Sequence, residues 1–146
     1  MKQLFFACAL AACAPTAPPY DPDPRGPAGG PAGAACPAIG SSDWAAWVDA
    51  MPSPGPRRRP ILTVTGKVLV PTGGYRVEWA DMRVAESYPV QVFADLRLIP
   101  PTGGATQAVT TLEVRGSWPI EPPVGSLTVR CGSEVLARIS PVETAH

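Results

Sequence analysis

Few side chains in this sequence could serve as acids, bases or activated nucleophiles. Serine hydrolysis needs a histidine beside the nucleophile, and the single histidine, His146, stands at the C-terminal position. A glycosidase needs two carboxyl groups that face one sugar, and for Asp81, Glu86 and Asp95 we expect solvated strand and loop positions instead. The segment Pro71–Gly74 lacks the Gly-Lys-Ser/Thr of a P-loop. The sequence therefore predicts no catalytic residues and a protein that is not an enzyme.

Two segments carry candidate binding residues. Arg57, Arg58 and Arg59 form the one charge cluster, and prolines on both sides hold it extended, so their guanidinium groups could bind phosphates or carboxylates. The alternative is a solvated loop that keeps this segment soluble. Trp118 begins an extended, proline-rich stretch that continues to Val124. Its indole either folds back onto the domain or is an exposed anchor for a protein partner.

The composition divides the chain into a linker and one folded domain. The 146 residues suffice for one domain, and 45% of them are hydrophobic, but Pro 20 and Gly 14 are too many for a fully folded chain. The 12 basic and 12 acidic side chains balance, which argues against a nucleic-acid partner.

The first residues have the order of a secretory signal. A positive start, Met1–Gln3, precedes the apolar run Leu4–Leu10, which is too short to span a bilayer. The run ends at Leu10-Ala11-Ala12-Cys13, which resembles the lipobox of bacterial lipoproteins. The resemblance implies that residues 1–12 are a signal peptide and that Cys13 becomes the acylated first residue of the mature protein. The alternative is an ordinary cleaved signal with an incidental cysteine.

The same resemblance predicts a location. Two or three acyl chains on Cys13 anchor a protein durably, so the membrane is the expected partner through this lipid anchor. The next residue is Ala14 rather than the aspartate that retains such lipoproteins in the inner membrane. We therefore expect a lipid-anchored protein of the outer membrane that faces the periplasm, with the inner membrane or secretion as alternatives.

The predicted signal peptide and lipid anchor also determine the expected roles of the linker and of the four cysteines. Residues 13–35 are the acylated cysteine and a Pro/Gly/Ala-rich tether with almost nothing to bury. Cys8 leaves with the signal and Cys13 takes lipid, so Cys36 and Cys131 remain as a disulfide pair in an exported protein, or else as two separate thiols. Two cysteines alone cannot hold a structural zinc ion, and we expect no metal and no cofactor.

The domain, residues 36–146, begins with a helical pattern. Ser42 is a plausible N-cap, and Trp44, Trp47, Val48 and Met51 fall at the i, i+3, i+4 and i+7 positions of one helix face. The spacing predicts a short helix up to Met51 that packs on a sheet. The alternative is that Trp44 and Trp47 are a pair exposed for a ligand or glycan.

The rest of the domain alternates between apolar and polar residues, as half-buried strands do. Strands are predicted at residues 61–70, 75–79, 89–99 and 108–115, followed by a hairpin of 126–131 with 134–139 across Gly132-Ser133. The segment Pro-Thr-Gly-Gly serves as a turn at residues 71–74 and again at 101–104. The pattern predicts an antiparallel β-sandwich or small barrel of about six or seven strands with one short N-terminal helix.

These predictions lead to a membrane-anchored cell-envelope lipoprotein whose domain is a non-enzymatic binding or accessory module for an envelope protein or polymer. The alternative function is a periplasmic inhibitor of proteases or other hydrolases. The inhibitory loop would then be Trp118–Val124 or Arg57–Arg59.

Overall fold

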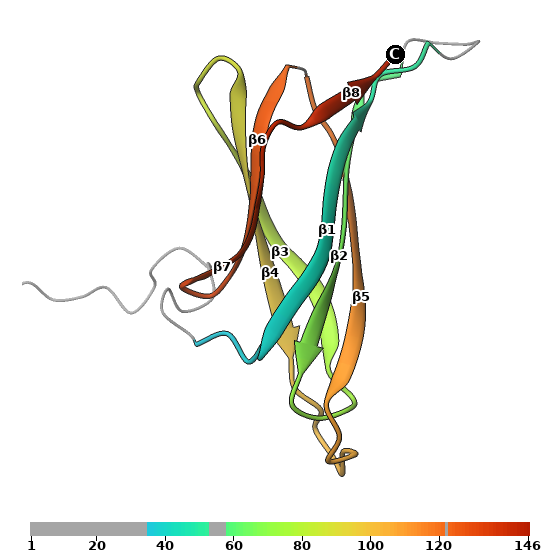
Figure 1. Cartoon of the computed structure of the whole chain (residues 1–146), viewed down its shortest axis with the longest axis vertical. Helices are drawn as coiled ribbons and strands as arrows, with labels where there is room; N and C mark the ends of the chain where they lie inside the picture. Colours follow the sequence, from blue (N-terminus) through green and yellow to red (C-terminus); the bar gives the residue numbers. More distant parts are fainter. Residues whose placement is uncertain (1–34, 53–57, 122) are drawn as a thin grey trace, which may run out of the picture.

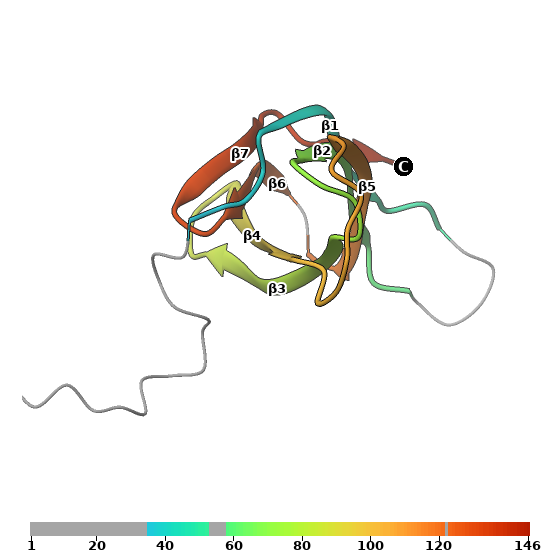
Figure 2. The same ribbon diagram turned by 90° about the horizontal axis from the view of Figure 1, so that it is seen from below.

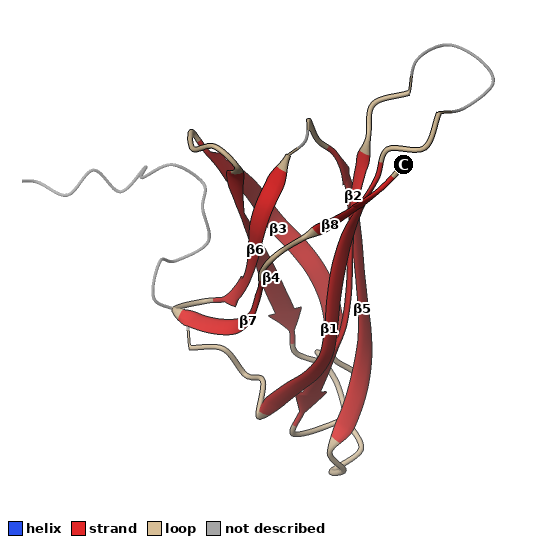
Figure 3. Cartoon of the chain, turned by 45° about the horizontal axis from the view of Figure 1, so that its top comes forward, coloured by secondary structure: helices blue, strands red, loops and turns tan. Residues whose placement is uncertain are grey.

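The computed structural model describes residues 35–52, 58–121 and 123–146. This part of the chain contains strands and loops and no helix (Figure 3). The strands are β1 (Gly40–Asp49), β2 (Ile61–Val70), β3 (Arg76–Ala85), β4 (Val90–Ile99), β5 (Thr110–Pro119), β6 (Val124–Cys131), β7 (Glu134–Ile139) and β8 (Glu143–Ala145).

The strands form two sheets of four that face each other (Figures 1 and 2). Sheet A has the order β5-β2-β1-β8 and sheet B the order β3-β4-β6-β7. The prediction of a mainly β sandwich or small barrel agrees with this arrangement in its mainly β character, but the described residues form eight strands instead of six or seven. Two pairs, β1 with β8 and β4 with β6, are parallel, so the prediction of a purely antiparallel sheet is wrong at these pairs. Parallel neighbours arise because the partner strands are separated by long crossovers rather than by tight turns.

The core lies between the sheets and is built by strict alternation along the strands. The buried side chains of β2 and β4 are those that the sequence pattern places on one face: Leu62, Val64, Val68 and Val70 on β2, and Val92, Ala94, Leu96 and Leu98 on β4. Sheet B completes this core from β6 with Leu127 and Val129. Because half of these residues are valines, which are β-branched, they also favour the extended backbone that places them there.

The predicted helix up to Met51 is wrong, because these residues form strand β1. The pairing of β1 with β2 shifts register between Ser42 and Ala45, and Asp43 in the shifted segment has a φ of 56°. Beyond the bulge, Ala46 and Val48 face the core together with Trp44, while Trp47 does not pack on it. The same residues thus fit a period of two as well as the helical period, and pairing with β2 and β8 selects the strand.

Three tryptophans of the core lie against two glycines. A Cβ atom added to Gly66 would lie 2.3 Å from the ring of Trp44, and one added to Gly116 would lie 2.3 Å from Trp118 and 2.8 Å from Trp79. Gly66 and Gly116 sit on the inward face of neighbouring strands β2 and β5. The missing side chains therefore make the space that the indole rings fill.

The two Pro-Thr-Gly-Gly segments connect the sheets. The first joins β2 of sheet A to β3 of sheet B, and the second begins the return from β4 to β5. The loops touch each other, since the amide of Gly73 donates a 3.0 Å hydrogen bond to the carbonyl of Thr106. Gly74 has a φ of 81°, a conformation that glycine adopts without strain. The β6–β7 hairpin forms across Gly132-Ser133 as predicted.

Side-chain hydrogen bonds link the edges of the two sheets. On one side the indole N–H of Trp79 on β3 donates to the carbonyl of Arg115 on β5 at 2.8 Å. On the other side the hydroxyl of Ser41 on β1 donates to the carbonyl of Leu136 on β7 at 3.0 Å. The two carbonyls belong to β5 and β7, which are edge strands of their sheets. Unpaired backbone groups on an edge strand can otherwise pair with a strand of another chain. Seen from below, the strands accordingly surround the core on all sides (Figure 2).

Candidate functional site

The disulfide between Cys36 and Cys131 is present, as predicted from the sequence. The two Cα atoms are 5.3 Å apart, and the bond joins residues separated by 95 positions. It ties the segment before β1 to the last residue of β6, next to the β6–β7 turn. The chain that precedes Cys36 therefore enters the domain at the hairpin end of sheet B.

The predicted lipid-attachment residue Cys13 and the first arginine of the cluster, Arg57, lie outside the described residues. Arg58 and Arg59 are exposed and come just before β2. The next residue, Pro60, accepts a 2.9 Å hydrogen bond through its carbonyl from the amide of Ile120. The structure thus brings the arginine segment beside the connection that follows Trp118.

Trp118 packs inward. It lies in strand β5, is partly buried against the core, and meets Trp79 edge to face, with ring centroids 5.0 Å apart and planes at 84°. This arrangement is favourable for aromatic pairs. It matches the interpretation in which the indole folds back onto the domain, and it leaves little of Trp118 for a partner.

Two of the carboxylates considered as acid–base candidates, Asp95 and Asp81, lie beside arginines. Asp95 on β4 receives hydrogen bonds from Arg130 at 2.8 and 3.1 Å and from Arg83 at 3.3 Å. Asp81 lies opposite Asp95 on β3, whereas Glu86 is apart from both, after the end of that strand. Desolvation raises the pKa of Asp95 above its usual value, the charge of Arg83 opposes the rise, and the charge of Asp81 adds to it. This cluster holds the outer face of sheet B together.

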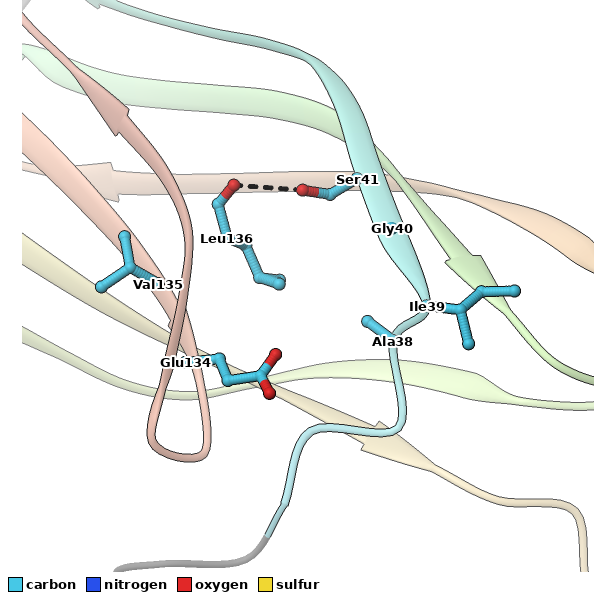
Figure 4. Close-up of a pocket in the computed structure, with 7 residues that line it drawn as sticks. All are labelled: Ala38, Ile39, Gly40, Ser41, Glu134, Val135 and Leu136. Carbon is cyan, nitrogen blue, oxygen red and sulfur yellow. Dashed lines mark hydrogen bonds between the residues drawn. The ribbon is translucent and has the colours of Figure 1, made fainter.

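An open pocket of about 220 Å³ lies where β7 approaches the segment before β1 (Figure 4). Ala38, Ile39, Gly40 and Ser41 line one side, and Glu134, Val135 and Leu136 line the other. The bond from Ser41 to Leu136 crosses it, and the side chains of Ile39 and Val135 point away from each other (Figure 4). The pocket is shallow and offers few converging polar groups, unlike an enclosed small-molecule site.

The outer face of sheet A has a different composition. One row of strand partners crosses all four strands, and we call Glu143, Trp47, Thr63 and Ser117 the Trp47 row. Trp47 is half-buried, Thr63 is 6% exposed, and the hydroxyl oxygens of Thr63 and Ser117 are 3.4 Å apart. An indole is thus placed among hydroxyl groups and one exposed carboxylate on a sheet surface.

The neighbouring rows extend this face. Asp49 and Ile61 pair on one side of the Trp47 row, and Thr65 pairs with Arg115 on the other. Further along β2, Lys67 forms a 2.9 Å ion pair with Asp43, and this hydrogen-bonded carboxylate raises the pKa of the Lys67 ammonium. The face therefore carries separated charges of both signs around a largely uncharged centre.

The spacing of Trp44 and Trp47 in the sequence indicates this surface if the segment is a strand, but the interpretation of the segment as a helix hides it. Trp44 and Trp47 are three positions apart, which places them on one side of a helix but on opposite sides of a strand. Trp44 packs in the core, whereas Trp47 belongs to the outer face of sheet A. The period of two in Trp44, Ala46 and Val48 would have separated the two rings.

Comparison of the chain with protein-family models, with curated proteins and with solved structures finds no match. Within residues 35–52, 58–121 and 123–146, no group of three or more His, Cys, Asp or Glu side chains could hold a metal ion. The same part of the chain has no helix long and apolar enough to cross a membrane. A proposal for the function therefore depends on the side chains and charges that the described surfaces present.

Proposed function

We propose that the protein is a cell-envelope lipoprotein, anchored through Cys13 in the outer membrane and facing the periplasm, whose β domain is a non-enzymatic binding module. The observation that carries the proposal is the Cys36–Cys131 disulfide behind a lipobox-like N-terminus. Structural disulfides persist in oxidising compartments such as the periplasm. Export and acylation at Cys13 would deliver the domain to that compartment.

The tether gives the module its reach. A linker of roughly 22 residues, the number between Cys13 and Cys36, would reach about 26 Å as a flexible coil and about 70 Å as extended polyproline II. They join the domain beside the β6–β7 turn, where Cys36 is fixed to Cys131. The outer faces of both sheets would then be open to partners while the lipid stays in the bilayer.

Binding rather than catalysis suits the side chains on these faces. The carboxylate of Asp95 is engaged by Arg130 and Arg83, and the single histidine, His146, lies beyond β8. The outer face of sheet A instead presents the Trp47 row, with an aromatic ring, the exposed hydroxyl of Ser117 and the carboxylate of Glu143. Such a mixture of one apolar body and polar neighbours is typical of recognition surfaces.

The intact mass of the full chain extracted from membranes, with and without reductant, tests this proposal. We expect a polypeptide that starts at Cys13 and carries acyl chains, with a gain of about two daltons when the disulfide is reduced. An unacylated protein that starts at another residue would contradict the anchor. A mass unchanged by reductant would contradict the disulfide.

A hydrolase inhibitor is the second candidate, favoured by the exposed Arg58 and Arg59 beside the backbone of Ile120. An inhibitory loop must be exposed and resist cleavage by its target protease. Incubation with trypsin separates the two functions. Cleavage within Arg57–Arg59 with full trypsin activity supports the binding module, whereas an intact loop with trypsin inhibited supports the inhibitor.

A further inference from the structure

We propose that the outer face of sheet A around Trp47 binds a neutral glycan chain that lies flat across the strands. This inference rests on the proposed function, because it names the ligand class of the binding module. The site consists of the Trp47 row together with Asp49 and Arg115 from the two neighbouring rows.

The first argument is the position of Trp47. The other three tryptophans, Trp44, Trp79 and Trp118, pack against the core, but Trp47 is not among the side chains that do so. A tryptophan on the outside of a sheet keeps apolar ring area where threonine or lysine would serve solubility better. The C–H groups of a pyranose ring supply a complementary apolar face for an indole, so the ring has a natural partner in a sugar.

The second argument is the set of polar groups around the ring. Sugar hydroxyls both donate and accept hydrogen bonds, and they need both kinds of partner at a fixed spacing. Glu143 lies beside Trp47 on β8, and the hydroxyls of Thr63 and Ser117 follow on the opposite side. Carboxylates accept and hydroxyls do both, so a ligand that crosses the row meets an acceptor, an aromatic surface and, beyond the buried Thr63, the exposed hydroxyl of Ser117.

The third argument is charge and shape. Asp49 and Glu143 are negative and Arg115 is positive, so the site has little net charge and does not select a polyanion. The 220 Å³ pocket described above lies elsewhere, between β7 and the segment before β1. Four strands at their usual spacing make a surface about 14 Å across, which fits several units of a chain better than one enclosed small molecule.

The test is a binding measurement with the full chain, purified in detergent with its disulfide intact. Isothermal titration with cellohexaose, maltohexaose and chitohexaose covers neutral glycans of different linkage. We expect saturable binding of at least one probe. Trp47→Ala should weaken it about tenfold or more, as truncation of an aromatic anchor does, and Glu143→Ala should weaken it less.

Tyr88→Ala is the matched control, because Tyr88 is an 87% exposed aromatic side chain on a loop outside sheet A. This variant should bind like the native protein, and thermal unfolding should show all three variants folded. No binding to any probe, or binding unchanged by both Trp47→Ala and Glu143→Ala, would overturn the inference. The proposed anchor is judged separately by the mass measurement, which does not depend on any glycan.

Discussion

Gly66 shows how a single atom decides the packing of the core. The ring of Trp44 occupies the place where its Cβ would be, at 2.3 Å, which no real contact tolerates. We expect Gly66→Ala to displace the indole and lower the free energy of unfolding by about 1–3 kcal/mol, the usual effect of overpacking. Urea unfolding followed by tryptophan fluorescence measures the change.

Gly40→Ala is the control for that substitution. Gly40 also lies in a strand, but no heavy atom stands within 4 Å of its added Cβ. This variant should unfold at or slightly above the native midpoint, because alanine loses less backbone entropy on folding than glycine. Equal destabilisation of both variants would show that backbone effects rather than the tryptophan ring dominate.

The arginines of sheet B differ in what they contribute. Arg130 binds Asp95 through two nitrogens, lies 5.9 Å from the ring of Phe93, and its side chain is 32% exposed. Arg83 reaches Asp95 through one nitrogen at 3.3 Å and is 55% exposed. We expect Arg130→Ala to cost about 1–2 kcal/mol of unfolding free energy and Arg83→Ala about 0.5 kcal/mol or less.

Denaturant titrations of the two variants in low salt and in 1 M sodium chloride check this difference. Salt should reduce the small effect of Arg83→Ala and leave most of the effect of Arg130→Ala. An equal loss for both arginines would mean that the bidentate geometry adds nothing beyond a surface ion pair.

At the level of strands, the alternation of apolar and polar residues is a sufficient guide where one face is buried and the same residues do not also fit the helical period. β2 and β4 were predicted almost to the residue because their valines and leucines repeat every second position between turn segments. β1 was missed because Trp44, Trp47, Val48 and Met51 satisfy the helical period, and no local signal outweighs it. The choice depends on pairing with β2 and β8, which lie far along the chain.

The alternation of residues along single strands predicts neither which strands pair nor which residues form the candidate site. The Pro-Thr-Gly-Gly loops look like hairpin turns in the sequence, but they carry the chain from one sheet to the other. The Trp47 row gathers residues from β1, β2, β5 and β8, so it exists only once the register is known. The cysteine pair was predictable, because excluding Cys8 and Cys13 leaves one partner for each remaining thiol.

The hydrogen bond that links β3 to β5 predicts that two tryptophan substitutions will lower the stability of the domain by different amounts. Trp79 donates its indole N–H to the Arg115 carbonyl at the β3–β5 side, whereas the indole N–H of Trp44 is buried without a partner. Trp79→Phe should therefore lower the free energy of unfolding by about 1 kcal/mol more than Trp44→Phe, which removes the same volume. Hydrogen exchange should also quicken along β5 in Trp79→Phe. Equal stabilities of the two variants would contradict the role assigned to this bond.

The whole domain is closed at its N-terminal side by one covalent link. The Cys36–Cys131 disulfide encloses β1 to β6 in a single loop, since the two cysteines are 95 positions apart. On the chain-entropy model such a loop stabilises the fold by about 4–5 kcal/mol, because the unfolded chain loses conformational freedom. This contribution is comparable to the whole stability of many small domains.

Cys36→Ser with Cys131→Ser should therefore lower the urea midpoint strongly, and reductant should do the same to the native chain. The slope of the unfolding transition should rise, because an unfolded chain without the link exposes more surface. Cys13→Ser, which changes a cysteine outside the disulfide, is the control, and residues 36–146 of this variant should unfold at the native midpoint. A double variant with the native midpoint would show that packing of the two sheets alone holds the domain. In that case the strands would remain folded in a reducing compartment, and the disulfide would no longer argue for the periplasm.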